Sequence, residues 1–200
     1  MDRQQRTQEK IRTAARELFI KHTVSRVTAE EIASYAGVSK KTLYNHFSSK
    51  EELEKEVFRM FIADIRVQIE RLAHAEEDFP FKFRKLMSLI TRVTGILTNR
   101  LIEDLQQNKR ELWTMIDEER HTTFVDGVTP LFRQGQEQGF IRQSIDLPFV
   151  VEMLYRNIRV ISDADFIRYS GHSLSELAPK TLDILMNGIM EKRETVKEEA

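Results

Sequence analysis

The sequence contains no cysteine among its 200 residues, so disulfide bonds, thiol catalysis and cysteine-based metal sites are excluded. No apolar run approaches the roughly 20 residues that span a bilayer. The first residues, Met1 to Lys10, are polar and no apolar segment follows them, so no signal peptide is expected. These absences predict a cytoplasmic protein with no membrane partner.

An excess of either charge is also lacking, because 31 Lys and Arg residues stand against 32 Asp and Glu residues, a net charge of −1. DNA-binding domains are usually basic, so this average argues against nucleic acid. Residues 1–50, however, hold ten Lys or Arg and five Asp or Glu, a net of +5, and the remainder holds 21 and 27, a net of −6. The cationic surplus therefore lies in the first quarter of the chain.

Strand-like alternation and internal repeats are absent as well, and helical periodicity takes their place. Between Gln8 and Ile20 the apolar residues follow the i, i+3/i+4, i+7 spacing of one helix face. Long helical patterns then cover 51–75 and 81–105, and another covers 109–138 with an interruption expected at Gly127 and Pro130. A helix capped by Asp146 is predicted to run towards Gly171, and Pro179 is predicted to open the last helix.

Three helix starts and a glycine turn occur between residues 28 and 50. Thr28 can cap a short helix, and Glu31 three residues later completes a capping box. Gly37 supplies the turn because glycine adopts a positive φ freely, and Ser39 can cap the next helix. Helices of about eight residues are unstable alone. We therefore expect them to pack on the helix of residues 8–20 as a helix-turn-helix unit.

The helix that follows Ser39 has two unlike faces. At roughly 100° per residue, Leu43 and Phe47 lie together. The opposite face suits base edges in the major groove and consists of Lys41, Thr42 and Asn45. Nearby side chains suit phosphates instead, namely Thr28, Lys40, Tyr44 and Lys50, and His46 flanks the outward face with Tyr44. Taken singly, each of these residues is typical of an ordinary solvated surface, and it is their combination that favours DNA binding.

The stretch from Arg12 to Leu53, through AARELFIKH and VTAEEIASYAGVSKKTLYNHFSSKEEL, resembles the TetR (tetracycline-repressor-like) family of bacterial transcriptional regulators. The resemblance implies backbone contacts with DNA from Thr28, Ser39, Tyr44, His46 and Lys50, and base contacts from Lys41, Thr42 and Asn45. One departure is Lys41, where many relatives carry glycine. A weaker similarity in RQGQEQGFIR and TLDILMNGI implies a second domain that binds an effector and dimerises through its last two long helices.

We therefore expect an all-α protein with a helix-turn-helix DNA-binding domain at residues 1–50 and a helical-bundle ligand-binding and dimerisation domain at 51–200. Five side chains of the second domain are candidates for the effector site: Met87, Ile90, Thr94, Trp113 and Phe124. Phe132 is a further candidate. Core packing without a cavity explains such side chains equally well. The sequence does not reveal the identity of the effector.

Acidic clusters suggest other chemistry but do not favour it. His121 lies among four carboxylates that could hold a metal, namely Asp117, Glu118, Glu119 and Asp126. No second histidine follows at i+4, so a solvated helix face is favoured and no metal site is predicted. Glu103 and Asp104 could face a cationic ligand, although acidic pairs lie more often at the surface. We predict no catalytic residues and no cofactor.

The predicted function is that of a homodimeric transcriptional regulator, a repressor that binds a pseudo-palindromic operator in double-stranded DNA and is released by a small molecule. The alternative is an all-helical protein-binding module or enzyme whose N-terminal three helices pack on a protein partner. Salt dependence separates the two, because DNA binding releases counterions from phosphates and weakens steeply as salt rises.

Overall fold

The structure is a computed structural model that describes residues 2–189, and all of its regular structure there is helical. Within this range the helices are α1 (Arg3–His22), α2 (Ala29–Tyr35), α3 (Lys40–His46), α4 (Lys50–His74), α5 (Phe79–Ile96), α6 (Asn99–Asn108), α7 (Arg110–Glu137), α8 (Leu147–Ile161), α9 (Ala164–Ser170) and α10 (Leu174–Ile189). The predicted all-α class is confirmed. None of these helices is both long and apolar enough to cross a lipid bilayer.

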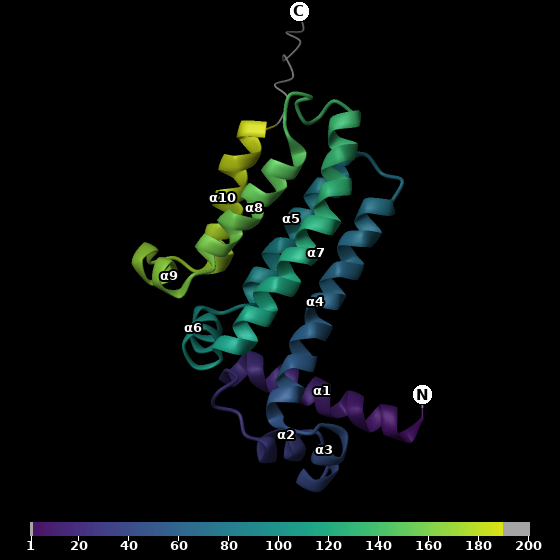
Figure 1. Cartoon of the computed structure of the whole chain (residues 1–200), viewed down its shortest axis with the longest axis vertical. Helices are drawn as coiled ribbons and strands as arrows, with labels where there is room; N and C mark the ends of the chain where they lie inside the picture. Colours follow the sequence, from purple (N-terminus) through teal and green to yellow (C-terminus); the bar gives the residue numbers. More distant parts are fainter. Residues whose placement is uncertain (1, 190–200) are drawn as a thin grey trace, which may run out of the picture.

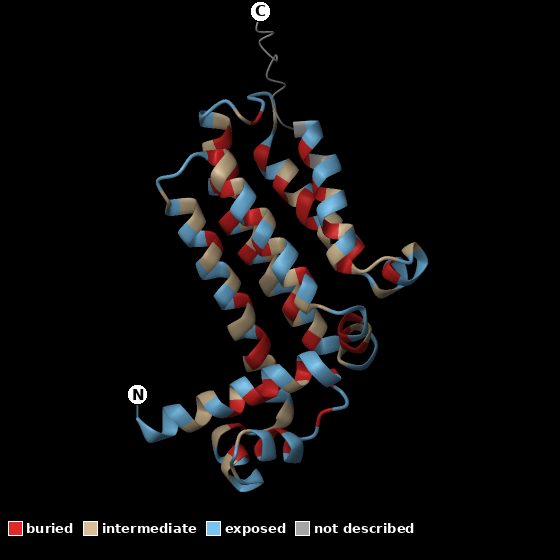
Figure 2. Cartoon of the chain, turned by 180° about the vertical axis from the view of Figure 1, so that it is seen from behind, coloured by how far each residue is buried: buried red, intermediate tan, exposed pale blue. Residues whose placement is uncertain are grey.

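The chain has a small head and a longer body (Figure 1). The head consists of α1 to α3, residues 3–46, and the body consists of α5 to α10, residues 79–189. Helix α4 starts in the head and runs along α7 through the length of the body. Helices α8 and α10 pack together on the other side of α5 and α7. Buried residues form stripes on the inward faces of these helices, as Figure 2 shows.

The predicted local signals of the head are confirmed. The Thr28 hydroxyl accepts a hydrogen bond from the Glu31 backbone, and the Glu31 carboxylate accepts one from the Thr28 backbone, so the capping box at α2 is complete. Ser39 caps α3, and Gly37 has a φ of +68° in the turn between the two helices. The apolar sides of all three helices, including Phe19, are buried together.

The apolar core of the head continues into the body. Leu43 of α3 and Phe47, which directly follows α3, belong to the same buried cluster as Leu53 of α4. This cluster also contains Leu105 of α6 and Leu112 of α7. The predicted division after residue 50 thus falls at the first turn of α4, and no linker separates the two parts.

Two predicted helix boundaries in the body are wrong. The single helix expected at 81–105 is two helices, because the Thr98 hydroxyl accepts a hydrogen bond from the Leu101 backbone at 3.2 Å and starts α6. The helix expected to run towards Gly171 ends at Ile161, and Asp163 caps the separate short helix α9. Short capping signals within apolar stretches account for both errors.

The two prolines expected to disrupt or open helices do neither. Pro130 lies inside the continuous helix α7, and Pro179 lies inside α10, which already begins at Leu174. In α7 the neighbouring Gly127 also fails to interrupt the helix. Packing of α7 against α4 and α8 stabilises the helix despite the backbone bond that Pro130 cannot make.

Gly127 instead lies where α4 packs tightly against α7. A Cβ at this position would lie 2.5 Å from Cγ2 of Ile69, a buried side chain of α4. Ile69 is branched at Cβ and therefore has little freedom to move aside. A side chain at position 127 would force the two longest helices of the described chain apart.

We expect Gly127→Ala to destabilise the protein by about 1–2 kcal/mol, because overpacking costs about 1–3 kcal/mol and the better helix propensity of alanine returns up to about 1 kcal/mol. Gly95→Ala is the matched control, since a Cβ at this helical glycine would meet nothing within 4 Å. It should be neutral or slightly stabilising. Urea denaturation measures both free energies of unfolding, and an unchanged value for Gly127→Ala would contradict the close packing.

Candidate DNA interface and ligand cavity

The outward face of α3 carries the residues predicted to read bases. Lys41 and Asn45 are exposed, and Thr42 is half-buried. Leu43 and Phe47 on the opposite side are fully buried against α1 and α2. Burial of these two side chains fixes the rotation of α3 about its own axis. The polar face then points outward, and it has the width of one helix, which the major groove of DNA can admit.

Most of the predicted phosphate-contacting residues belong to α3 or to its cap. Lys40 forms an ion pair with Glu30, and its ammonium group lies 5.9 Å from the ring centre of the exposed Tyr44. The Ser39 hydroxyl lies 2.8 Å from that of Thr42, so the α3 cap also positions one predicted base-reading side chain. Thr28 is exposed and His46 is half-buried.

Lys50 differs from the other predicted phosphate contacts because its amino group is used inside the protein. It donates a hydrogen bond to the Val24 carbonyl at 2.8 Å and lies 3.1 Å from the Glu54 carboxylate. An ammonium group has three hydrogens, so one donor remains for a phosphate. The main contacts of Lys50 join the loop after α1 to the start of α4.

Asp104 of α6 makes a second connection between head and body. Its carboxylate accepts hydrogen bonds from the Val24 backbone at 2.9 Å, from the Ser25 backbone at 3.0 Å, and from the Ser25 hydroxyl. Asn108 donates a further bond at 3.0 Å. Burial acts to raise the pKa of Asp104, but the hydrogen bonds from Ser25, Asn108 and Val24 outweigh it, and the pKa is lowered.

Glu54 of α4 is the other buried carboxylate of this region. It lies 3.1 Å from the Lys50 amino group and 2.9 Å from that of Lys109, the residue before α7. Lys50 in turn holds the Val24 carbonyl, and Asp104 holds the Val24 amide. We call these five residues, Val24, Lys50, Glu54, Asp104 and Lys109, the polar joint.

The sequence did not indicate the polar joint. The sequence predicts that Asp104 either faces a cationic ligand or lies at the surface. It is instead buried against the Val24–Ser25 loop that follows α1, which we call the head loop. Its neighbour Glu103 is at the surface and pairs with Arg168 at 2.9 Å. The partners of Asp104 are backbone amides some 80 positions away, and helix periodicity carries no information about such pairings.

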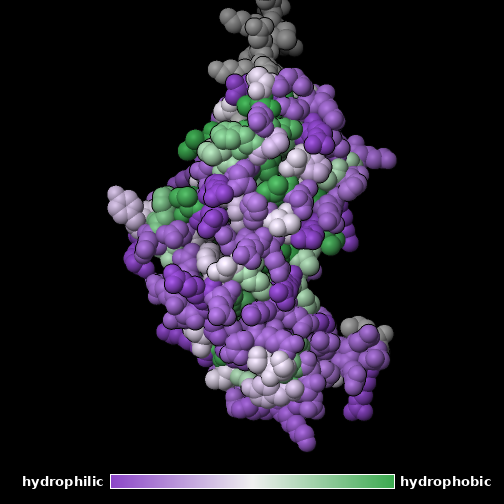
Figure 3. All heavy atoms as spheres, viewed as in Figure 1, coloured by the Kyte–Doolittle hydropathy of each residue, from purple (hydrophilic) through white to green (hydrophobic). Residues whose placement is uncertain are grey.

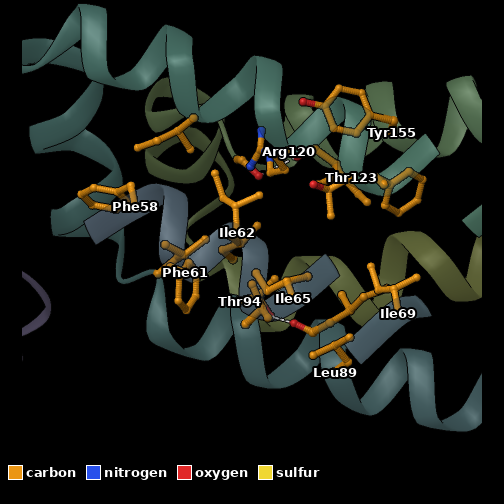
Figure 4. Close-up of a pocket in the computed structure, with 18 of the residues that line it drawn as sticks. Phe58, Phe61, Ile62, Ile65, Ile69, Leu89, Thr94, Arg120, Thr123 and Tyr155 are labelled. Atoms are coloured by element: carbon orange, nitrogen blue, oxygen red, sulfur yellow. Dashed lines mark hydrogen bonds between the residues drawn. The ribbon is translucent and has the colours of Figure 1, made fainter. Parts of the chain in front are cut away.

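An apolar cavity of about 120 Å³ lies inside the body between α4, α5, α6 and α7, with α8 and the start of α10 closing one side. Helix α4 contributes Phe58, Phe61, Ile62, Ile65 and Ile69. Figure 4 shows these side chains in a row across the view, with Arg120 and Thr123 above them and Leu89 below. An engineered cavity of comparable size, about 150 Å³, admits benzene. This cavity therefore has room for a small apolar group.

Four of the five predicted effector-site residues line this cavity: Ile90, Thr94, Trp113 and Phe124. The structure does not bring Met87 to it, and Met87 instead packs against the apolar core of the body. Phe132 is buried in the same core. Met87 precedes Ile90 by three residues on α5 and is not among the residues that line the cavity.

Several cavity residues were not predicted, above all the polar group on α7 and α8. Arg120 lines the cavity, and its guanidinium lies 5.6 Å from the ring centre of Trp113 and 5.8 Å from that of Tyr155. Burial raises the pKa of Tyr155 to about 12, and its hydroxyl donates to Asp117. The signal for Arg120 was its position one helical turn from Thr123 and two turns from Trp113 on α7.

His121, the one histidine of the acidic cluster weighed above as a metal site, has a different role. His121 Nε2 lies 2.8 Å from the Glu152 carboxylate, and its ring packs edge-on against Tyr155. Among residues 2–189 no three histidine or acidic side chains converge in a way that could hold a metal ion.

Comparison with known proteins identifies the N-terminal segment. Residues 11–57 match the model of the family described as bacterial regulatory proteins, tetR family. An uncharacterised helix-turn-helix transcriptional regulator of Bacillus subtilis, YvaF, is 26% identical over 81% of this chain and 85% of its own. The fatty acid metabolism regulator protein of the same organism is 25% identical over 90% of this chain and 93% of its own.

Solved structures share the whole fold. One is the triclosan complex of SmeT, the repressor of a multidrug efflux pump of Stenotrophomonas maltophilia, with a TM-score of 0.69. It is 20% identical, and the match covers 93% of this chain and 92% of that chain. At this level of identity the likeness concerns the fold.

The polar joint predicts a pH dependence of stability. Because the pKa of Asp104 is lowered by folding, the stabilisation it gives is complete above the ordinary aspartate pKa of about 3.9 and is lost as the pH falls through the lowered value. Asp104→Asn should destabilise the protein by about 1–3 kcal/mol near neutrality. Its difference from the wild type should shrink from about pH 5 to about pH 3. Urea denaturation across this range measures both effects.

Glu103→Gln is the control for this experiment, because it removes a neighbouring carboxylate that lies at the surface. It should keep the stability and the pH profile of the wild type. A constant difference between Asp104→Asn and the wild type at every pH would contradict the role given to the Asp104 carboxylate.

Proposed function

Because this chain is a member of the TetR family of bacterial regulatory proteins, we propose that it is a DNA-binding transcriptional repressor that a small-molecule effector releases from its operator. The observation that carries the proposal is the exposed polar face of α3, whose rotation is fixed by the buried Leu43 and Phe47. In this proposal Lys41, Thr42 and Asn45 enter the major groove. The protein acts in the cytoplasm, where bacterial DNA lies, and it performs no catalysis.

Phosphate contacts orient the head on the duplex. Lys40 and Tyr44 are exposed on α3, His46 is half-buried at its end, and Ser39 and Thr28 cap α3 and α2. Lys50 uses its remaining hydrogen for a phosphate and holds the Val24 loop with the others. Contacts of this kind fix register and make binding dependent on salt, while the base contacts give sequence preference.

A homodimer supplies the second head. The apolar stripes expected to form the interface lie at 147–161 and 182–190, of which residue 190 falls outside the described range. Their inner residues, such as Leu154 and Leu182, are buried within the chain. Their outer apolar residues are exposed, namely Phe149, Met153 and Val160 on α8 and Ile184 on α10. Figure 3 shows hydrophobic side chains gathered over the α8 and α10 side of the body, while the head is largely hydrophilic.

The three exposed α8 residues follow helical spacing and form one face, as a helix-to-helix contact requires. Two copies related by a twofold axis would bury this face against its equivalent. The two heads then meet two inverted half-sites on one side of the duplex.

The body cavity is the proposed effector site. Ile90, Thr94, Trp113 and Phe124 line it, and so do residues of α4 from Phe58 to Ile69. Among the proteins with this fold, SmeT has been solved with triclosan, and a relative is named for fatty acid metabolism. These names support a small, largely apolar effector. Met87 is not proposed as a ligand contact because it lies away from the cavity.

The polar joint links the cavity to the head in this proposal. Helix α6 lines the cavity through Leu105 and holds the head loop through the adjacent Asp104. A ligand shifts the equilibrium between two forms only if it binds them with different affinity. An effector that displaces α6 changes the position of Val24 and Ser25, and with them the angle of the head.

The base contacts and phosphate contacts should respond differently to mutation. We expect Asn45→Ala to cost about 1–3 kcal/mol at particular base pairs only. Lys40→Ala should weaken binding to all duplexes and lower the salt slope by about one. Binding titrations over a salt series test both, with an operator selected by the wild-type protein from a random duplex pool. The selected operator should contain two inverted half-sites.

Circular dichroism provides the folding control, since both side chains are exposed. If the wild type selects no sequence and its binding is insensitive to salt, the protein-binding alternative replaces DNA binding. If Asn45→Ala weakens every duplex equally, Asn45 is not a base reader.

A further inference from the structure

The hydroxyl groups in the cavity wall differ in whether their hydrogens are already used. Thr94 donates its hydroxyl hydrogen to the Ile90 carbonyl at 2.9 Å, and Ser162 donates to the Ile158 carbonyl at 2.6 Å. Tyr155 donates to Asp117. These three hydroxyl groups have no hydrogen left for a ligand.

Two neighbouring groups on α7 keep a donor. Arg120 donates through Nη2 to Asp117 at 2.9 Å, whereas its buried Nε has no hydrogen-bond partner among the described residues. The Thr123 hydroxyl accepts from the exposed Arg66 at 3.2 Å, and no acceptor within residues 2–189 takes its hydrogen. The two residues are one helical turn apart, so their side chains are neighbours. Figure 4 shows them on one side of the cavity, across from Thr94 and Leu89.

The cavity also has one sign of charge. Arg120 is the only charged residue among those that line it in the described chain, and no carboxylate is among them. The carboxylate that pairs with Arg120 is Asp117, which is shared with Arg159 at 3.0 Å. The group of Arg120, Asp117 and Arg159 therefore carries a net positive charge, which favours an anion and disfavours a cation nearby.

Arg120 is also held in place before any ligand binds. Its guanidinium lies 5.6 Å from the ring centre of Trp113 and 5.8 Å from that of Tyr155, and its ion pair with Asp117 fixes the orientation. A side chain that is already oriented loses little conformational entropy when it donates a hydrogen bond to a ligand. An unpartnered buried guanidinium nitrogen costs free energy until an acceptor reaches it.

The shape of the space limits the rest of the ligand. The α4 wall from Phe58 to Ile69 is about 16 Å long at 1.5 Å per residue, yet the cavity volume is only about 120 Å³. The space is therefore narrow, and apolar side chains of α4 and α5 form most of its walls. A thin hydrocarbon group fits it better than a fused ring system.

We propose, as a refinement that rests on the effector site proposed above, that the cavity binds a slender apolar monocarboxylic acid. Its carboxylate accepts hydrogen bonds from Arg120 Nε and from the Thr123 hydroxyl. Its hydrocarbon part lies along Ile62, Ile65 and Ile69. The charge-assisted bond to Arg120 supplies the specificity, and burial of the hydrocarbon supplies most of the affinity.

Hexanoate is the probe, and Trp113 is the reporter because it is the single tryptophan and lines the cavity. Titration of the full chain with hexanoate should change the tryptophan fluorescence in a saturable way. Hexanamide and hexylamine have the same carbon chain with a neutral and a cationic head group. The amide should bind about tenfold more weakly or worse, as expected when a charged hydrogen bond is lost, and the amine should not bind.

Matched variants test the two donors. Arg120→Gln should weaken hexanoate binding by about tenfold or more and remove the preference over hexanamide. Arg159→Gln is its control, because Arg159 also pairs with Asp117 but is half-exposed and does not line the cavity. It removes the same charge as Arg120→Gln, yet solvent screens that charge, so hexanoate binding should weaken by about twofold at most. Thr123→Val preserves shape and should weaken binding by about two- to tenfold. Thr94→Phe fills the space without adding a second tryptophan and should abolish binding.

If Arg120→Gln fails to fold, Thr123→Val and the comparison of head groups still decide the question. Preference of the wild type for hexylamine, equal affinity for acid and amide, or no saturable response to hexanoate would each overturn the proposal. Operator binding separates it from the wider function. If hexanoate binds but leaves operator affinity unchanged, the cavity is not an effector site, although it still binds a carboxylic acid. If a cation bound in the cavity releases the operator, the effector site stands, but its proposed specificity for an acid is wrong.

Discussion

The position of the head depends on two buried carboxylates, Asp104 and Glu54. Removing a carboxylate from water is costly unless hydrogen bonds and opposite charges replace the lost hydration. Here the replacements come from the Val24–Ser25 loop, from Lys50 and from Lys109. The donors must therefore stay in place for the carboxylates to remain buried, and this requirement fixes the loop after α1 against α4 and α6. Apolar contacts between head and body add stability, but they do not prescribe direction as hydrogen bonds do.

Much of the fold could be predicted from local signals, because the signals and the structure they specify lie within one helical turn. The caps at Thr28 and Ser39, the turn at Gly37 and the buried face of α3 depend on neighbouring residues only. The reading face was predictable for the same reason. Predictions failed where partners distant in sequence override local preference. Pro130 and Pro179 remain inside helices, since tertiary packing stabilises both helices despite the missing bonds.

The residues that line the cavity could be predicted from the sequence only in part. Helical spacing placed Ile90 and Thr94 on a common face, and both line the space, but it could not separate them from Met87 on the same helix. Arg120 and Thr123 were overlooked because charged and hydroxyl residues in a helix are most often solvated. Their significance depends on which hydrogens remain unpaired after folding, a property of the assembled structure. The same holds for Asp104, whose backbone partners lie in another part of the chain.

The proposed switch follows from which walls of the cavity can move. Helices α4 and α7 are tightly packed at Gly127, where Ile69 fills the available space, so they cannot close further there. Pockets that hold drug-sized ligands have volumes of about 300–1,000 Å³. The cavity here has a volume of about 120 Å³, so a ligand of larger volume can enter only if one of the surrounding helices moves. Moving α6 stretches the bonds from Asp104 to the head loop, and those bonds are short and directional. The cost of breaking buried charged bonds favours rotation of the head with α6. In the repressor proposed here, the interactions that fix the head are therefore also the ones that transmit occupancy of the cavity to the DNA.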